Sequence, residues 1–183
     1  MFIDAKTQAH TRAVAAFLQQ HAHRITHVAV AHTRYPTFER TVYEMQRAIE
    51  LAKQDCRHFR NCLNADLYGR RAQRKPLLYR PLLIATLEGS LINTDRDLTL
   101  HYNFAFGNLP AELTDAEFVR KLRSCWIEHA GQRDDIWYEN VAGNTARACG
   151  WLDYSMKEAT DKGNVAVWDF ENTQIPYAAF DAG

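Results

Sequence analysis

The chain has 183 residues, enough for one domain with a substantial core, and its 46% hydrophobic and 24% charged residues argue against wholesale disorder. Its 22 basic side chains balance its 22 acidic ones, so any contact with nucleic acid or a membrane must come from a local patch. No apolar run could span a bilayer and no signal peptide is recognisable, which predicts a cytoplasmic protein without a membrane partner. The cysteines form no Cys-x-x-Cys pair, so reduced thiols are expected rather than a zinc ribbon.

The amino-terminal part of the chain predicts a helix, a strand and a long helix. Residues 5–22 favour a modest helix, and residues 25–32 predict the first strand. Apolar residues spaced alternately four and three apart between Phe38 and Leu63 place one stripe along a long helix, which is typical of a helix packed on a core. The histidines around the first strand lack the spacing of a helical metal site and are expected mostly at the surface; they are His21, His23, His27 and His32.

A positively charged segment follows the long helix. Residues 69–76 combine glycine, proline and charge, which predicts a loop, and its basic side chains are Arg70, Arg71, Arg74 and Lys75. A solvated loop accounts for this composition. Alternatively, the loop contacts phosphates and gives a protein of zero net charge a local binding site for nucleic acid.

Two consecutive strands carry the most informative pattern in the sequence. Residues 82–88 are nearly all apolar and end in Glu88, whereas residues 98–106 alternate with the period of two that marks a strand with two different faces. One face of the second strand is hydrophobic, and the other carries His101 and Asn103 among small residues. We expect the two strands to pair antiparallel, which would bring Glu88 towards His101. The polar face indicates a sheet with one packed face and one open working face.

Helices and a strand alternate in the next part of the chain. A capping-box pattern at residues 114–117 predicts a helix that runs to about residue 129, and residues 136–141 predict a short strand. A further helix, from about residue 145 to about residue 160, places Tyr154 and Lys157 three residues apart on one side.

The order of these elements predicts the fold class. Residues 165–170 are a candidate last strand, and residues 171–183 are a candidate tail. Strand pairs interleaved with helices favour a single α+β domain over residues 1–183, with helices packed mainly on one face of an antiparallel sheet.

Several of these side chains have the chemistry of one site. The carboxylate, imidazole and amide oxygen of Glu88, His101 and Asn103 suit a divalent cation such as Mg²⁺ or Mn²⁺, which could polarise a phosphodiester. A tyrosine such as Tyr154 can attack phosphorus and hold the strand covalently. Lys157 could then stabilise the phenolate or the charge developing on the phosphate.

In order and content these elements resemble the HUH endonuclease superfamily, which includes rolling-circle replication initiators (Rep proteins), relaxases and transposases. That family has a ferredoxin-like (RRM-like) antiparallel sheet, a His-hydrophobic-His metal motif on a strand, and a nucleophilic tyrosine on a later helix, often as Tyr-x-x-Lys. Here Leu-His-Tyr-Asn-Phe at residues 100–104 stands at the metal motif, Glu88 at its acid, and residues 150–158 at the single-tyrosine motif. Residues 25–33 match the motif of the first strand, so the resemblance spans residue 25 to about residue 162.

The resemblance implies metal-dependent nicking and joining of single-stranded DNA or DNA hairpins, as in the replication or transfer of mobile elements. Tyr154 would be the nucleophile, assisted by Lys157, and a Mg²⁺ or Mn²⁺ ion would be held by Glu88, His101 and Asn103. The residues implied to bind the DNA backbone are Arg70, Arg71, Arg74 and Lys75.

One position departs from the family pattern and keeps two alternatives open. Asn103 stands where the family has its second histidine, and an amide oxygen is a weaker ligand than imidazole. The first alternative is therefore a non-catalytic DNA-binding relative on the same fold. The second is a protein–protein interaction domain that uses the long helix and the aromatic tail, which a net charge of zero favours over DNA binding.

Overall fold

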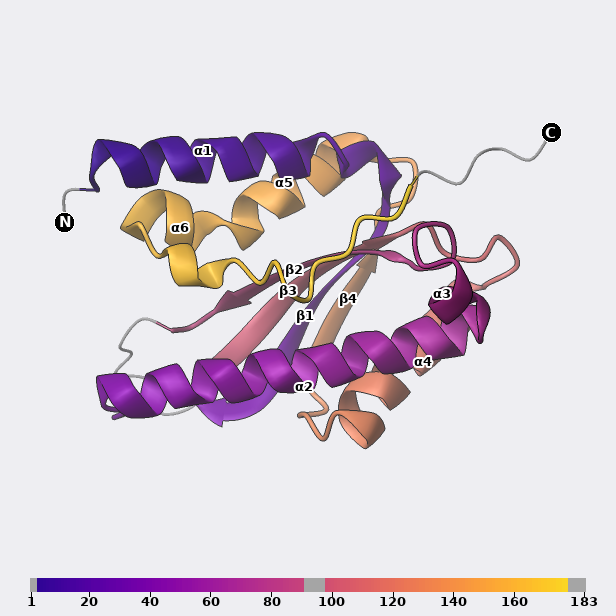
Figure 1. Ribbon diagram of the computed structural model, residues 1–183, viewed down its shortest axis with the longest axis horizontal. Helices are drawn as coiled ribbons and strands as arrows, with labels where there is room; N and C mark the ends of the chain where they lie inside the picture. Colours follow the sequence, from indigo (N-terminus) through magenta and orange to yellow (C-terminus); the bar gives the residue numbers. More distant parts are fainter. Residues whose placement is uncertain (1–2, 91–97, 178–183) are drawn as a thin grey trace.

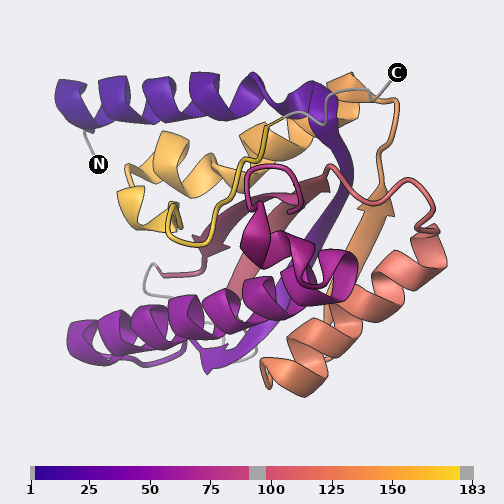
Figure 2. The ribbon, with the colours of Figure 1, turned by 45° about the vertical axis from the view of Figure 1, so that its right-hand side comes forward.

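The computed structural model describes residues 3–90 and 98–177, which form three layers. A four-stranded antiparallel sheet lies between two groups of helices (Figure 1). The sheet consists of β1 (Ile25–Pro36), β2 (Leu82–Glu88), β3 (Thr99–Gly107) and β4 (Ile136–Asn140). On one side lie α2 (Val42–Tyr68) and α4 (Asp115–Arg123), and on the other lie α1 (Ala5–Gln19), α5 (Thr145–Ser155) and α6 (Lys157–Lys162). The rotated view in Figure 2 keeps the same separation of layers.

The strands follow the order β2-β3-β1-β4, and every neighbouring pair is antiparallel. With α2 connecting β1 to β2, and α4 connecting β3 to β4, this is the βαββαβ arrangement of ferredoxin-like domains. The predicted α+β class with an antiparallel sheet is thereby confirmed. The predicted pairing of β2 with β3 is confirmed as well, because Glu88 stands opposite His101 in the register.

Local sequence signals explain where the two connecting helices begin. Thr41 caps α2 and Thr114 caps α4, each in a capping box with the glutamate three residues later. The apolar stripe of α2 faces the sheet, and Phe59 at its centre is completely buried. After α4 the chain continues in a π-helical turn over Ser124–His129, which buries Trp126.

The hydrophobic face of β3 forms the larger core together with α2 and the turn after α4. Tyr102 and Phe104 stack with ring centroids 5.1 Å apart, and Trp126 meets the Phe104 ring edge-on at 5.6 Å. Each fully buried side chain of this size contributes roughly 1.5–3 kcal/mol through the apolar area it removes from water. The even-numbered residues of β3 therefore anchor the sheet and leave the odd-numbered ones on the opposite face.

The expectation of an open second face is wrong over most of the sheet, because helices pack on both faces. Half of that face is apolar and forms a second core with α1, α5 and α6, to which Val28 and Ile84 contribute from the sheet. Apolar strand residues of this kind must be buried against another element. Here they are covered by α1 from the amino-terminal part of the chain and by α5 and α6 from its carboxyl-terminal part. Only the other half, which carries Glu88, His101 and Asn103, is polar.

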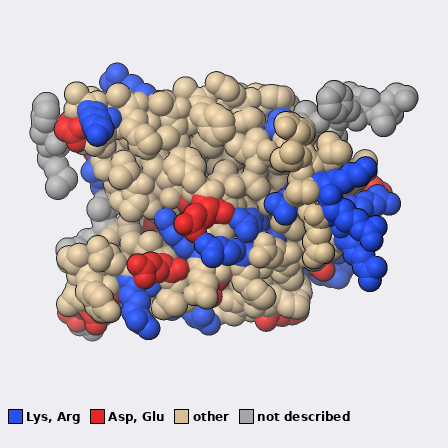
Figure 3. Space-filling model, viewed as in Figure 1, with Lys and Arg blue, Asp and Glu red and all other residues tan. Residues whose placement is uncertain are grey.

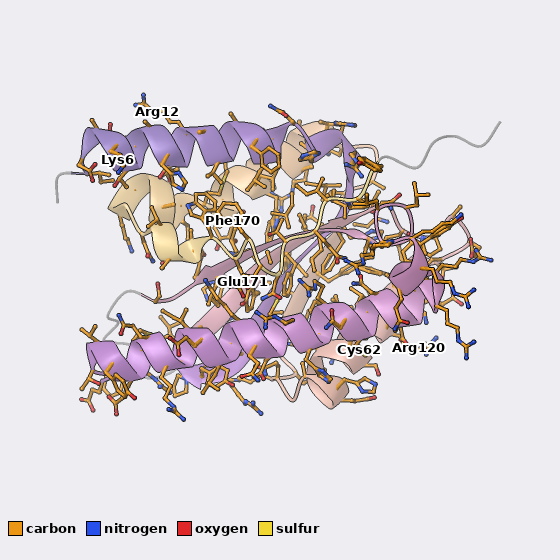
Figure 4. The ribbon with its side chains drawn as sticks, in the orientation of Figure 1. Lys6, Arg12, Cys62, Arg120, Phe170 and Glu171 are labelled. Atoms are coloured by element: carbon orange, nitrogen blue, oxygen red, sulfur yellow. The ribbon has the colours of Figure 1, made fainter. Side chains whose placement is uncertain are left out.

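The chain after α6 also differs from its expected form. Residues 165–170 form a 3₁₀ turn (Val165–Val167) and an isolated bridge between Trp168 and Thr86 of β2, so a last strand is absent there. The chain then crosses between the two helical layers, where Phe170 and Glu171 lie (Figure 4). Residues 171–177 therefore pack on the domain, and the rest of the candidate tail, residues 178–183, lies outside the described residues.

Two further differences concern helices. The predicted loop at residues 69–76 contains a short helix, α3 (Arg71–Arg74), and the predicted helix near residues 145–160 is broken at Met156 into α5 and α6. Within the described residues no helix combines the length and apolarity needed to cross a membrane.

Candidate active site

A row of polar side chains crosses the second face of the sheet on three adjacent strands. Glu88 of β2 stands opposite His101 of β3, which stands opposite His32 of β1. The Nε2 atom of His101 lies 3.3 Å from Oε2 of Glu88, and the rings of His101 and His32 stack with centroids 5.2 Å apart. The register alone therefore concentrates a carboxylate and two imidazoles at one end of the sheet.

Asn103 lies next to this row on the same face of β3 and is 1% exposed. Neither atom of its amide, nor Oε1 of Glu88, forms a hydrogen bond of normal geometry within the described residues, although the amide lies close enough to Glu88 to help lower the pKa of that carboxyl. A buried polar atom without a partner costs roughly 1–3 kcal/mol, and native proteins contain few of them. These atoms lie next to one another at the polar end of the sheet.

Lys157 and Tyr154 reach the same place from the helices above the sheet. The Nζ atom of Lys157 lies 3.1 Å from Oε2 of Glu88 and 3.6 Å from the centroid of the Tyr154 ring. The prediction that one continuous helix carries both residues is wrong. The helix breaks at Met156, so Tyr154 belongs to the last turn of α5 and Lys157 is the first residue of α6. The two side chains nevertheless touch, and Tyr154 is 48% exposed.

The charges of this cluster stabilise one another. Burial alone would raise the pKa of Glu88, but its interactions with His101, Asn103 and Lys157 outweigh burial and lower it. Burial likewise pulls the pKa of Lys157 down, and the neighbouring Tyr154 and Glu88 more than offset it. The pKa of His32 is lowered, chiefly by burial and then by the nearby His101. At neutral pH the site thus holds an ionised carboxylate, an ammonium group and a neutral His32.

The predicted ligands Glu88, His101 and Asn103 are of types that a hard divalent cation accepts. The described residues contain no group of three or more His, Cys, Asp and Glu side chains that could hold a metal ion, although Glu88, His101 and His32 stand in one row. Carboxylate and amide oxygens are ligands that Mg²⁺ and Mn²⁺ accept, and the unpartnered Oε1 of Glu88 and the Asn103 amide are available for this role. In the structure the positive charge nearest to Glu88 Oε2 is the ammonium group of Lys157.

The structure does not bring the predicted DNA-binding segment to this site. Arg70, Arg71, Arg74 and Lys75 are all exposed, around α3. They belong to the basic patch at the right-hand end of the molecule in Figure 3, whereas β2 runs from near α3 to Glu88 at the opposite end of the sheet (Figure 1). The seven residues of β2 alone separate the two places by about 20 Å.

Sequence reasoning did not single out His32 or His27, which belong to a group of four histidines that was expected mostly at the surface. His32 belongs to the polar row and is half-buried, and His27 is buried between Phe118 and Tyr138, with Nε2 3.1 Å from Asp115. The sequence did indicate that His32 shares a strand face with Val28 and Val30, which predicts that it is partly buried. Its position beside His101 follows only from the pairing of β1 with β3.

Comparison with known proteins adds no relative: no family model, no curated protein and no solved structure matches this chain. The site is therefore defined by its own geometry. It combines a buried carboxylate, a histidine and an unpartnered amide on a ferredoxin-like sheet with an exposed tyrosine and a lysine that face them.

Proposed function

We propose that this chain nicks and joins single-stranded DNA through a covalent tyrosine–phosphodiester intermediate that forms on Tyr154. The observation that carries the proposal is the meeting of Glu88, His101, Asn103, Lys157 and Tyr154, which come from three separate stretches of sequence, at one polar end of the sheet. The buried atoms of Glu88 and Asn103 that lack a hydrogen bond of normal geometry support this proposal, because native proteins contain few such atoms.

Tyr154 would act as the nucleophile. The residue is 48% exposed, so a DNA strand can approach its hydroxyl group. A bond forms between the tyrosine oxygen and phosphorus while the bond from phosphorus to one deoxyribose oxygen breaks; the phenol releases its proton to solvent, and the departing sugar oxygen takes up a proton. Joining is the reverse exchange, in which a free sugar hydroxyl displaces the tyrosine.

Lys157 and the polar row would support this exchange. With its raised pKa, Lys157 stays protonated and supplies positive charge beside the tyrosine, where negative charge develops. Glu88, His101 and Asn103 are the residues that would hold a Mg²⁺ or Mn²⁺ ion. When bound, such an ion would draw electron density from the phosphodiester and make phosphorus more open to attack.

The first test is covalent capture. Wild-type protein incubated with mixed-sequence single-stranded oligonucleotides and Mn²⁺ should give a protein–DNA adduct that survives a denaturing gel, and peptide mass spectrometry should assign it to Tyr154. Addition of EDTA should abolish the adduct. Retention of DNA without any adduct would contradict the nicking reaction.

A non-catalytic DNA-binding relative is the second candidate, and one contact favours it. The ammonium group of Lys157 already lies 3.1 Å from Glu88 Oε2, so a built-in cation partly satisfies the carboxylate. This candidate predicts DNA binding of equal affinity with Mn²⁺ and with EDTA. The nicking reaction predicts instead that EDTA removes the covalent product.

The exposed basic patch around α3 gives a separate prediction for DNA binding. Replacing Arg70, Arg71, Arg74 and Lys75 together by alanine should weaken binding of single-stranded DNA and flatten its salt dependence. The slope of log affinity against log salt should fall by about 0.7 per lost phosphate contact, or about 3 for all four. Replacing the exposed Lys6 and Arg12 of α1 (Figure 4) is the control and should leave the slope unchanged. An unchanged slope in the fourfold variant would exclude this patch from the DNA path.

A further inference from the structure

Two tryptophan rings stack on each other and continue to the ring of Tyr154. Trp137 of β4 stacks on Trp151 of α5 with centroids 5.3 Å apart and planes at 23°, and Trp151 packs on Tyr154 at 5.6 Å and 33°. The indole N–H of Trp151 donates a hydrogen bond of 3.1 Å to the carbonyl of Phe104, which fixes the middle ring to the sheet. Trp151 is 5% exposed, whereas Trp137 and Tyr154 on either side of it are 44% and 48% exposed, so the middle ring is fixed and both outer rings are open to solvent.

A hollow of about 510 Å³ opens over this stack. It is lined by Val30, Trp137, Arg147, Gly150, Trp151 and Tyr154. Gly150 lines the hollow, and a Cβ atom added to it would meet nothing within 4 Å, so there is room for a side chain at this position. Arg147 is held at the rim by Glu139, which accepts hydrogen bonds of 2.9 and 2.6 Å from its guanidinium group.

We propose that this hollow, the aromatic pocket, binds an unpaired nucleobase of the strand whose phosphodiester meets Tyr154. The inference rests on the proposed function, since it names a subsite of that same site. Bases stack on exposed aromatic rings irrespective of sequence, and each such contact contributes about 1–3 kcal/mol. The pocket shares the Tyr154 ring with the polar cluster, so a base seated here holds the adjoining sugar–phosphate beside the tyrosine.

Flat aromatic walls favour a base over a protein side chain as the occupant. The rings of Trp137 and Trp151 are close to parallel, which is the arrangement that extends to one more planar ring. Two cationic side chains lie near the pocket, Arg147 on its rim and Lys157 beside Tyr154, and each is already paired with a carboxylate, Arg147 with Glu139 and Lys157 with Glu88.

The test compares a strand that has bases with one that lacks them. The affinity of full-length Tyr154→Phe protein, which keeps the ring but cannot capture DNA, is measured by fluorescence anisotropy for oligothymidylate of about ten nucleotides and for an abasic chain of equal length. Oligothymidylate should bind more tightly. Trp137→Leu should reduce its affinity by about 5- to 100-fold and leave abasic binding unchanged, and Trp137→Phe should restore most of the loss.

Gly150→Leu provides a second variant that fills the pocket without removing a ring, and it should weaken oligothymidylate binding in the same way. Equal affinity for the two strands, or an equal loss for both in Trp137→Leu, would overturn the proposal. Concentration-dependent association of the protein that Trp137→Leu abolishes would also overturn it, since the surface would then join copies of this chain. A Trp137-dependent preference for bases without any adduct in the wild type would leave the aromatic pocket standing and disprove the nicking reaction alone.

Discussion

Tyr154→Phe should lower the rate of DNA nicking by a factor on the order of 10⁴ or more, because loss of a nucleophile removes the covalent route altogether. Binding of the strand should be nearly unchanged. The phenylalanine ring keeps the packing on Trp151 and the place over the ammonium group of Lys157, so only the hydroxyl group is lost. Single-turnover cleavage of end-labelled oligonucleotides, resolved on a denaturing gel, measures the rate.

Tyr43→Phe is the matched control for that experiment. Tyr43 is 71% exposed near the start of α2, so it undergoes the same chemical change without any contact with the polar cluster. Its adduct yield should equal that of the wild type. An adduct that persists in Tyr154→Phe would show that another group carries the reaction.

Much of the fold was predictable because its strongest signals are local. The period of two in β3 separates two faces, and the structure buries Tyr102 and Phe104 in one core while His101 and Asn103 lie on the opposite face. The stripe along α2 identifies a packed helix without any tertiary information. What the sequence could not reveal is which segments cover the second face, since periodicity identifies an apolar strand face but not its partner.

The candidate site was only partly predictable, for a topological reason. Glu88 and His101 belong to strands that follow each other in the chain, and such strands commonly pair. His32 and Trp137 reach the site only because β1 lies between β3 and β4, and this order joins segments distant in sequence. The break at Met156, which accompanies the approach of Lys157 to Glu88, has no glycine or proline signal.

Glu88→Gln should lower the free energy of unfolding at neutral pH by about 3 kcal/mol, because it leaves Lys157 and His101 facing a neutral amide where they now face a completely buried carboxylate. Glu139→Gln is the control, since it breaks the exposed ion pair with Arg147 and should cost less than about 1 kcal/mol. Chemical denaturation of both variants, followed by circular dichroism, measures the difference.

The pH dependence separates a charge effect of Glu88 from a mere change of packing. Its folded-state pKa is lowered from 4.5, so the stabilisation is complete above that value and is lost as the pH falls through the folded pKa. The pKa of Lys157 is raised from 10.5, so its share is complete below that value and is lost as the pH rises through the folded pKa. The stability difference between wild type and Glu88→Gln should therefore be flat between these limits and shrink on acidification. A difference that stays constant into strong acid would mean that the shape of the side chain, and not its charge, holds the polar cluster together.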